Sequence, residues 1–206
     1  MIGDMDDRRL LDLGMPVPDS ALAHRARELI DDVAPAFLVN HSVRAYAWAV
    51  ELARHDDLEF DTEILYVSAM LHDIGLVPAY DLGGCFELDG AIAAERFAVD
   101  AGEQLSRARA IHDVIALHMA DALPPGSAAE ELLLNDSTGV DVRGRRIEDV
   151  RAESIQPVVA AYPRLEFKRE FAALFADQAA RKPICTVARM VASGSLAAIA
   201  NAPFDS

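Results

Sequence analysis

Residues 63–75 read EILYVSAMLHDIG, and this stretch decides the fold. Its apolar residues recur at helical spacing, an Asp-Thr pair just before it offers an N-terminal cap, and Gly75 is placed to end the helix. The polar pair His72 and Asp73 then falls in the last turn of an otherwise apolar helix. Because burying an unpartnered carboxylate costs several kcal/mol, the pair predicts a bound divalent cation or a hydrogen-bond network.

Two further side chains extend this pair into a candidate metal site. His41 begins the helical pattern of LVNHSVRAYAWAV (38–50), and Asp141 lies in STGVDVRG (137–144). Asp136 competes with Asp141 for the role, and this stretch also reads as an ordinary turn. A donor set of imidazoles and carboxylates accepts zinc, iron, manganese or nickel.

The order His, His-Asp, Asp resembles the HD-domain superfamily of metal-dependent hydrolases. The segments NHSVRAYAWAV, EILYVSAMLHDIG and FELDGAIAA, an acidic residue before YPRLEF, and RKP are similar to the cyanamide hydratase branch of that superfamily, over residues 40–183. The resemblance implies an all-α, single-domain HD helical bundle with one divalent metal between its helices, Zn²⁺ first, with Fe²⁺, Mn²⁺ or Ni²⁺ as alternatives. The metal ligands that it implies are His41, His72, Asp73 and Asp141.

Length and composition predict a single domain. The chain has 206 residues, 52% of them hydrophobic, and no Gly/Ser-rich or Pro-rich linker divides it. We therefore expect one domain over residues 1–206, with a core at about 20–185 and a peripheral tail at 1–18. Helical patterns cover 20–33, 41–55, 63–74, 86–102, 106–119, 128–134 and 165–180. A Pro- and Gly-containing loop at 76–84 is expected to overhang the metal.

Charge and cysteine content narrow the partners and the compartment. With 34 acidic against 19 basic residues, the net charge of -15 repels a phosphate backbone, so nucleic-acid binding is not expected. An acidic N-terminus without an apolar core and the lack of any long apolar run predict a soluble, cytoplasmic protein without membrane contact. Cys85 and Cys185 lie far apart and form no CxxC motif, which predicts two reduced thiols.

Three acidic or basic side chains are candidates for proton transfer beside Asp73. Glu87 and Asp89 lie in FELDG, although acidic residues are also common at helix starts. His118 shares a helix face with apolar residues and is either a proton-handling or a structural histidine. His112, six residues earlier, lies about 240° away around the helix, so a second metal held by both is not expected. The expected catalytic residues are Asp73, Glu87 and His118.

A metal-activated water adding to a small nitrile such as cyanamide, to give urea, is the function that the resemblance implies. The alternative is an HD-type phosphohydrolase acting on a nucleotide or another phosphate ester. Because residues 71–94 contain no Lys or Arg, only Arg44 and Lys182 remain near the site as cations, which disfavours this alternative. A metal-stabilised binding protein is a third reading. A homodimer formed through apolar loops such as LVPAY (76–80) is also expected.

Overall fold

The protein is described by a computed structural model, which covers the backbone of residues 3–205 and the side chains of residues 8–205. The described chain contains eleven α-helices and three short 3-10 helices and no strand, which confirms the all-α prediction. The helices are α1 Gly3–Asp12, α2 Ala21–Val33, α3 Ala36–Asp56, α4 Thr62–Leu71, α5 Phe86–Asp100, α6 Leu105–Leu117, α7 Ala129–Arg143, α8 Ala152–Ala161, α9 Phe167–Arg181, α10 Thr186–Ala192 and α11 Ser195–Ala200, with 3-10 turns at Ile74–Leu76, Pro78–Tyr80 and Ile147–Asp149.

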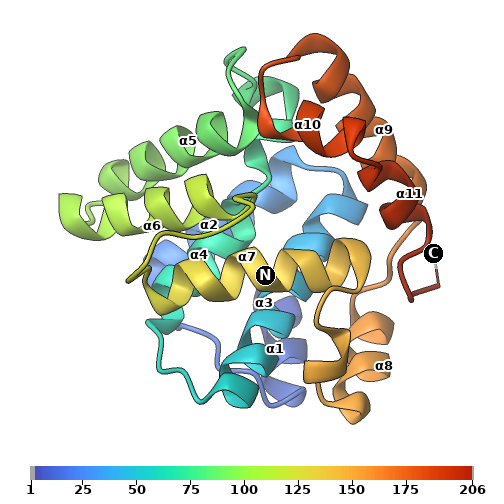
Figure 1. Ribbon diagram of the computed structural model, residues 1–206. Coiled ribbons are helices and arrows are strands. Elements are labelled where there is room, and N and C mark those ends of the chain that lie inside the picture. Colours follow the sequence, from blue (N-terminus) through green and yellow to red (C-terminus); the bar gives the residue numbers. More distant parts are fainter. Residues whose placement is uncertain (1–2, 206) are drawn as a thin grey trace.

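Helices α3 and α7 pack against each other at the centre of the molecule (Figure 1). The paired helices α5 and α6 lie on one side of them and α9 to α11 on the other. Every residue from 41 to 53 in α3 is buried. A helix that is covered on all faces belongs to the interior, so the polar residues of α3 must find partners there.

Several helices differ from those predicted. α3 begins at Ala36, directly after the N-cap Pro35, so His41 lies in its second turn rather than at its start. α7 continues through the expected turn at 137–141 as far as Arg143. α8, which contains Pro157, was not predicted at all. The patterns located the apolar segments but not the ends that packing decides.

Gly75 holds a different place from the expected helix end. α4 stops at Leu71, and Gly75 lies in the following 3-10 turn, without a left-handed backbone. A Cβ atom at Gly75 would lie 2.1 Å from the carbonyl oxygen of Phe86, and one at Gly90 would lie 3.3 Å from the carbonyl oxygen of His72. The two glycines therefore allow the backbone after His72 to pack directly on the first turn of α5.

Described segments near both chain ends contribute side chains to the core, one of them within the expected tail at 1–18. Leu10 and Met15 are 0% and 2% exposed and join the main apolar cluster. Near the other end, Phe204 stacks on Trp48 with ring centroids 6.2 Å apart. These long-range contacts are invisible in local sequence periodicity.

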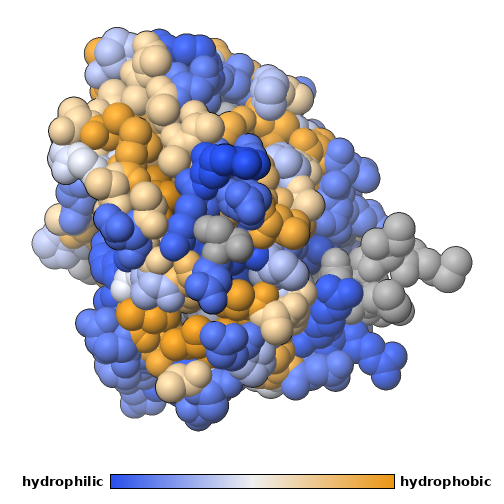
Figure 2. Space-filling model, turned by 90° about the vertical axis from the view of Figure 1, so that its right-hand side faces the viewer, coloured by the Kyte–Doolittle hydropathy of each residue, from blue (hydrophilic) through white to orange (hydrophobic). Residues whose placement is uncertain are grey.

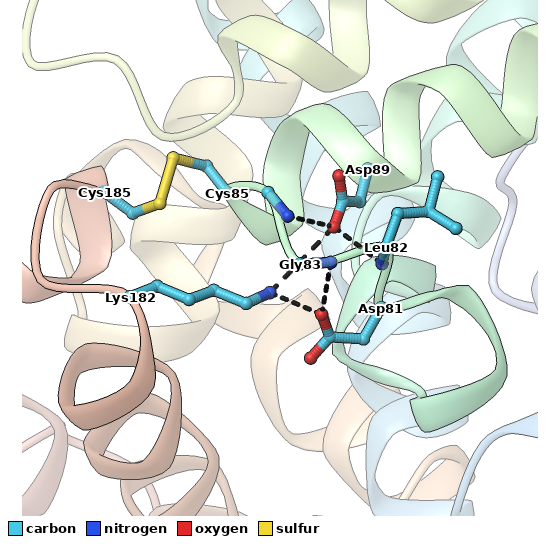
Figure 3. Close-up of a disulfide and its surroundings, with 8 residues drawn as sticks. Asp81, Leu82, Gly83, Cys85, Asp89, Lys182 and Cys185 are labelled. Atoms are coloured by element: carbon cyan, nitrogen blue, oxygen red, sulfur yellow. Dashed lines mark hydrogen bonds and ion pairs between the residues drawn. A yellow bond between two sulfur atoms is a disulfide. The ribbon is translucent and has the colours of Figure 1, made fainter.

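The cysteines form a disulfide, so the prediction of two reduced thiols is wrong. Cys85 directly precedes α5 and Cys185 directly precedes α10, and the fold brings their Cα atoms to 5.3 Å (Figure 3). This distance lies within the range that a disulfide requires. Their sequence separation of 100 conceals the pairing, because only the tertiary fold places the two helix starts side by side.

The surface gives little support to the expected interface at 76–80. Leu76 and Val77 are buried in a second apolar cluster with Phe residues of α9. On the face formed by the C-terminal part of the chain, hydrophilic and hydrophobic side chains alternate (Figure 2). Within residues 3–205, no helix combines the length and the apolar character that a bilayer crossing requires.

Candidate metal centre

Three buried side chains from two segments converge in the interior. His41 comes from α3, and His72 and Asp73 come from the turn that follows α4. Their potential ligand atoms all lie within 4.8 Å of one another, the only such group of three or more found in the described residues. The three residues are at most 1% exposed. The convergence of His41 with the His72-Asp73 pair agrees with the sequence prediction.

The hydrogen bonds of the two rings show which nitrogen atoms face the cluster. The Nδ1 of His72 donates to the carbonyl oxygen of Ala69 at 2.8 Å, and the Nδ1 of His41 donates to Asp141 at 2.8 Å. The Nε2 atoms therefore carry the lone pairs, and they face each other at 3.1 Å. Two lone pairs at this distance repel each other unless a proton or a cation lies between them. Two nitrogens bound to one zinc ion at a tetrahedral angle are roughly 3.3 Å apart.

Asp73 supplies the negative charge of the cluster. Its Oδ2 lies 3.4 Å from the Nε2 of His41 and 3.3 Å from the Nε2 of His72, yet this buried oxygen accepts no hydrogen bond from the described residues. Burial raises the pKa of Asp73, but the neighbouring histidines outweigh burial and hold the pKa well below its ordinary value. An ionised, buried carboxylate with an unused oxygen fits a divalent cation.

His41 also lies in surroundings that favour positive charge. Burial lowers its pKa, whereas Asp141 and Asp73 raise it, and the net shift is upward. A cation between the donors would satisfy the same field. The donor set of two imidazoles and a carboxylate therefore fits a divalent metal.

Asp141 lies behind His41 rather than around the cluster. Its Oδ2 accepts from His41 Nδ1 and from Arg44, each at 2.8 Å, and its Oδ1 accepts from Arg44 and Trp48, also at 2.8 Å. Arg164 adds a contact at 3.3 Å. Burial raises the pKa of Asp141, but Arg44 and its other partners hold it well below its ordinary value. Both oxygens are thus occupied by protein groups, and direct coordination by Asp141 stays a prediction.

The helix phase of α7 explains this position. At about 100° per residue, the cavity-lining side of α7 is centred roughly 130° away from Asp141. The α7 residues that line the cavity are Asn135, Thr138, Gly139, Val142 and Arg143. Asp141 instead points toward α3, where Arg44 and Trp48 lie one turn apart and donate hydrogen bonds to it. Asp136, the competing candidate, forms ion pairs with Arg145 and Arg146 away from the cluster.

His118, directly after α6, lies at the edge of the cluster. Its Nδ1 donates to the carbonyl oxygen of Ile115 at 2.6 Å, and its Nε2 faces the cluster, 3.6 Å from Asp73 Oδ1. The ring lies 5.0 Å from that of His72. His112 instead contacts Asp113 and takes no part in the cluster, as the helical spacing predicts.

The remaining polar candidates lie elsewhere. Glu87 is 5% exposed and its Oε2 has no hydrogen-bond partner in the described residues, but it does not line the cavity at the cluster. Its role in proton transfer stays a prediction. Asp89 accepts from the backbone of Leu82 and Gly84 and shapes the loop before α5, while Lys182 pairs with Asp81 at 2.8 Å (Figure 3). The contacts of Asp89 and Lys182 are structural.

A cavity of about 380 Å³ leads from the cluster to the surface. Its inner wall includes Phe171 and Phe175 of α9, which are buried, and its outer wall includes Asp121 and Ser193, which are exposed. Two arginines, Arg143 and Arg145, also line it. The sequence analysis counted only Arg44 and Lys182 as cations near the site and missed both, although Arg143 lies two residues after Asp141.

Comparisons with known proteins agree with this geometry. The model of the HD domain family matches residues 38–138, a range that contains His41, His72, Asp73 and His118. The chain is 27% identical to cyanamide hydratase DDI2 of Saccharomyces cerevisiae over 175 residues, which cover 82% of this chain and 77% of that relative. Cyanamide hydratase DDI3 of the same yeast matches to the same extent. Together with the cluster of His41, His72 and Asp73, these matches indicate a metal-dependent enzyme.

Proposed function

We propose, on the premise that this chain carries an HD domain, that it is a metal-dependent hydratase that adds water to a small nitrile-like substrate such as cyanamide, giving urea. The observation that carries the proposal is the buried group of His41, His72 and Asp73 at the inner end of an open cavity. A divalent cation, zinc first among the candidates, lowers the pKa of a bound water from 15.7 to about 7 and polarises the group under attack.

Side chains of the protein orient the metal ligands, transfer the proton and exclude water. Asp141 fixes the orientation of His41 through Nδ1, so that Nε2 faces the cluster, where it would hold a cation. His118, with its Nδ1 proton held by Ile115, has Nε2 available to accept a proton from water and return it to the substrate nitrogen. Phe171 and Phe175 exclude bulk water from the inner cavity.

The experiment is urea formation from cyanamide by purified protein whose metal content has been measured. Metal-loaded wild-type protein is expected to form urea, and chelation is expected to stop the reaction until zinc, iron, manganese or nickel is added back. If the protein binds metal but leaves cyanamide and related small nitriles unchanged, the hydratase proposal is wrong.

The second candidate is an HD-type phosphohydrolase. Arg44 and Lys182 do not support it, since they are paired with Asp141 and Asp81. The observation in its favour is that Arg143 and Arg145 line the cavity. Release of phosphate from nucleotides or sugar phosphates, with no urea from cyanamide, would select this candidate.

The proposal also includes the surroundings of the enzyme. The enzyme takes a small molecule as its substrate. Because its net charge of -15 repels other anions, neither nucleic acid nor an anionic membrane surface is a partner. A homodimer remains part of the proposal, now supported by Leu88 and Ile92, which are 46% and 50% exposed one turn apart on α5. A cytoplasmic location is proposed as well, and it conflicts with the usual rarity of disulfides there.

A further inference from the structure

The outer part of the metal cavity holds a guanidinium group without a carboxylate partner. Of the seven arginines in the described chain that are not exposed, six form an ion pair within 4.0 Å and Arg143 forms none. Its acidic neighbour on the cavity wall, Asp121, is 72% exposed and forms its ion pair with Arg189 instead. Arg143 is therefore available to a ligand.

Arg145 lies beside Arg143 because the chain reverses between them. Gly144 has a φ of 74° and ends α7 in the left-handed conformation, which folds Arg145 back over the helix. Gly139 makes room for it, since a Cβ there would lie 2.5 Å from Arg145 Nε. One Nη of Arg145 donates to Asn135, while its buried Nε has no partner in the described residues. Burial and the charge of Arg145 lower the pKa of Arg143, Asp121 raises it, and the net shift is downward.

A hydroxyl group on the same cavity is also unused. Ser195 lines the cavity, is 7% exposed, and its Oγ has no hydrogen-bond partner in the part of the chain that the structure describes. Buried hydroxyls and guanidinium nitrogens normally find acceptors. Arg143 and Ser195 thus leave donors without acceptors on one cavity, and Arg145, which already pairs with Asn135 and Asp136, adds its positive charge beside them.

We propose that Arg143, Arg145 and Ser195 form an oxyanion subsite, and that the substrate carries a carboxylate or phosphate group in addition to the bond that reacts at the metal. Guanidinium groups bind both oxyanions through paired N–H donors. The size of the cavity agrees, because about 380 Å³ holds roughly a dozen waters at about 30 Å³ each, whereas cyanamide has three non-hydrogen atoms. The subsite rests on the proposed function only for the identity of the reacting bond.

The test is calorimetric titration of the metal-loaded, full-length protein with inorganic phosphate and, separately, with acetate. Arg143→Gln is expected to weaken binding by about tenfold or more, the effect of losing one charge-assisted contact. Arg143→Lys, which keeps the charge, is expected to recover part of the affinity. Arg109→Gln is the matched control, because Arg109 is exposed and does not line the cavity. Tighter binding of one anion identifies the acidic group of the substrate.

Repeating the titration after chelation separates the arginines from the metal. If the difference between wild type and Arg143→Gln persists without metal, the anion binds at the proposed subsite. Equal affinity of wild type and Arg143→Gln for both anions, in a variant with an unchanged melting temperature, overturns the subsite. The proposed function fails independently, by absence of urea formation from cyanamide, whichever way the anions bind.

Discussion

The two sides of His41 differ in how they balance buried charge. On its Nδ1 side, Asp141 is surrounded by Arg44, Arg164 and Trp48, and both of its oxygens accept hydrogen bonds. On its Nε2 side, Asp73 has only histidines around it and keeps an oxygen without a donor. The protein neutralises Asp141 on the Nδ1 side, here called the closed side, whereas Asp73 on the Nε2 side, the open side, keeps an acceptor that fits a cation. Both carboxylates are buried, so burial alone does not identify a metal ligand. The carboxylate oxygen without a hydrogen-bond donor does identify one.

The strongest test of this comparison removes the carboxylate on the open side. Asp73→Ala is expected to reduce the metal content from about one ion per chain to nearly none and to abolish turnover, because the cation loses its anionic ligand. Elemental analysis and a urea assay measure the two effects. Asp113→Ala, at a side chain that is 60% exposed, is the control and should change neither. Full metal content in Asp73→Ala would show that the open side is not the binding site.

A second test concerns proton transfer by His118 on the open side. His118→Gln is expected to lower kcat by about 10²-fold to 10⁴-fold, the usual contribution of a general base, while the metal content stays the same. A steady-state urea assay and elemental analysis of the same sample separate the two effects. If the metal disappears together with activity, His118 is a ligand rather than the proton-handling group.

A substitution on the closed side should lower the stability of the fold more than it lowers the metal content. Asp141→Asn leaves Arg44 and Arg164 without their shared carboxylate, and the free energy of unfolding is expected to fall by about 3–5 kcal/mol. Metal affinity should weaken by about 10-fold to 100-fold, because His41 loses its orienting partner, but binding should persist. Urea unfolding and a metal titration measure these changes. Complete loss of metal with unchanged stability would instead restore Asp141 to the ligand role that the sequence predicts.

The sequence predicted the open side better than the closed side, for a physical reason. His72 and Asp73 are adjacent in the chain and interrupt an apolar helix, so their burial is visible without the fold. Asp141 fits the family order, but the angle at which α7 packs on α3 decides which way its carboxylate points. Arg44, one turn after His41, holds that carboxylate through two hydrogen bonds. Arg164 gave no local signal.

Much of the helical framework was also predictable, since seven apolar patterns fall on helices of the structure. The parts that were not predicted depend on contacts between distant segments. The disulfide joins residues 100 positions apart, and Leu10 and Phe204 reach the core from the two ends of the chain. Arg143 and Arg145 reach the cavity because α7 runs past its expected end. Periodicity carries no information on such contacts.

The smallest expected effect comes from the disulfide, which lies outside both sides of His41. It ties the start of α5 to the start of α10, and α10 and α11 supply Met190 and Ser195 to the cavity wall. The paired substitution Cys85→Ala with Cys185→Ala is expected to lower the free energy of unfolding by about 2–4 kcal/mol, chiefly through greater freedom of the unfolded chain. The metal content should not change, since α3, α4 and the turn after α4 carry the cluster. Chemical denaturation and elemental analysis test both statements, and loss of metal in the double variant would show that the cluster depends on this wall.

Alkylation of free thiols in intact cells, before and after reduction, tests the proposed cytoplasmic location at the same bond: an oxidised pair in the native host would argue for a more oxidising compartment, because glutathione keeps most cytosolic thiols reduced.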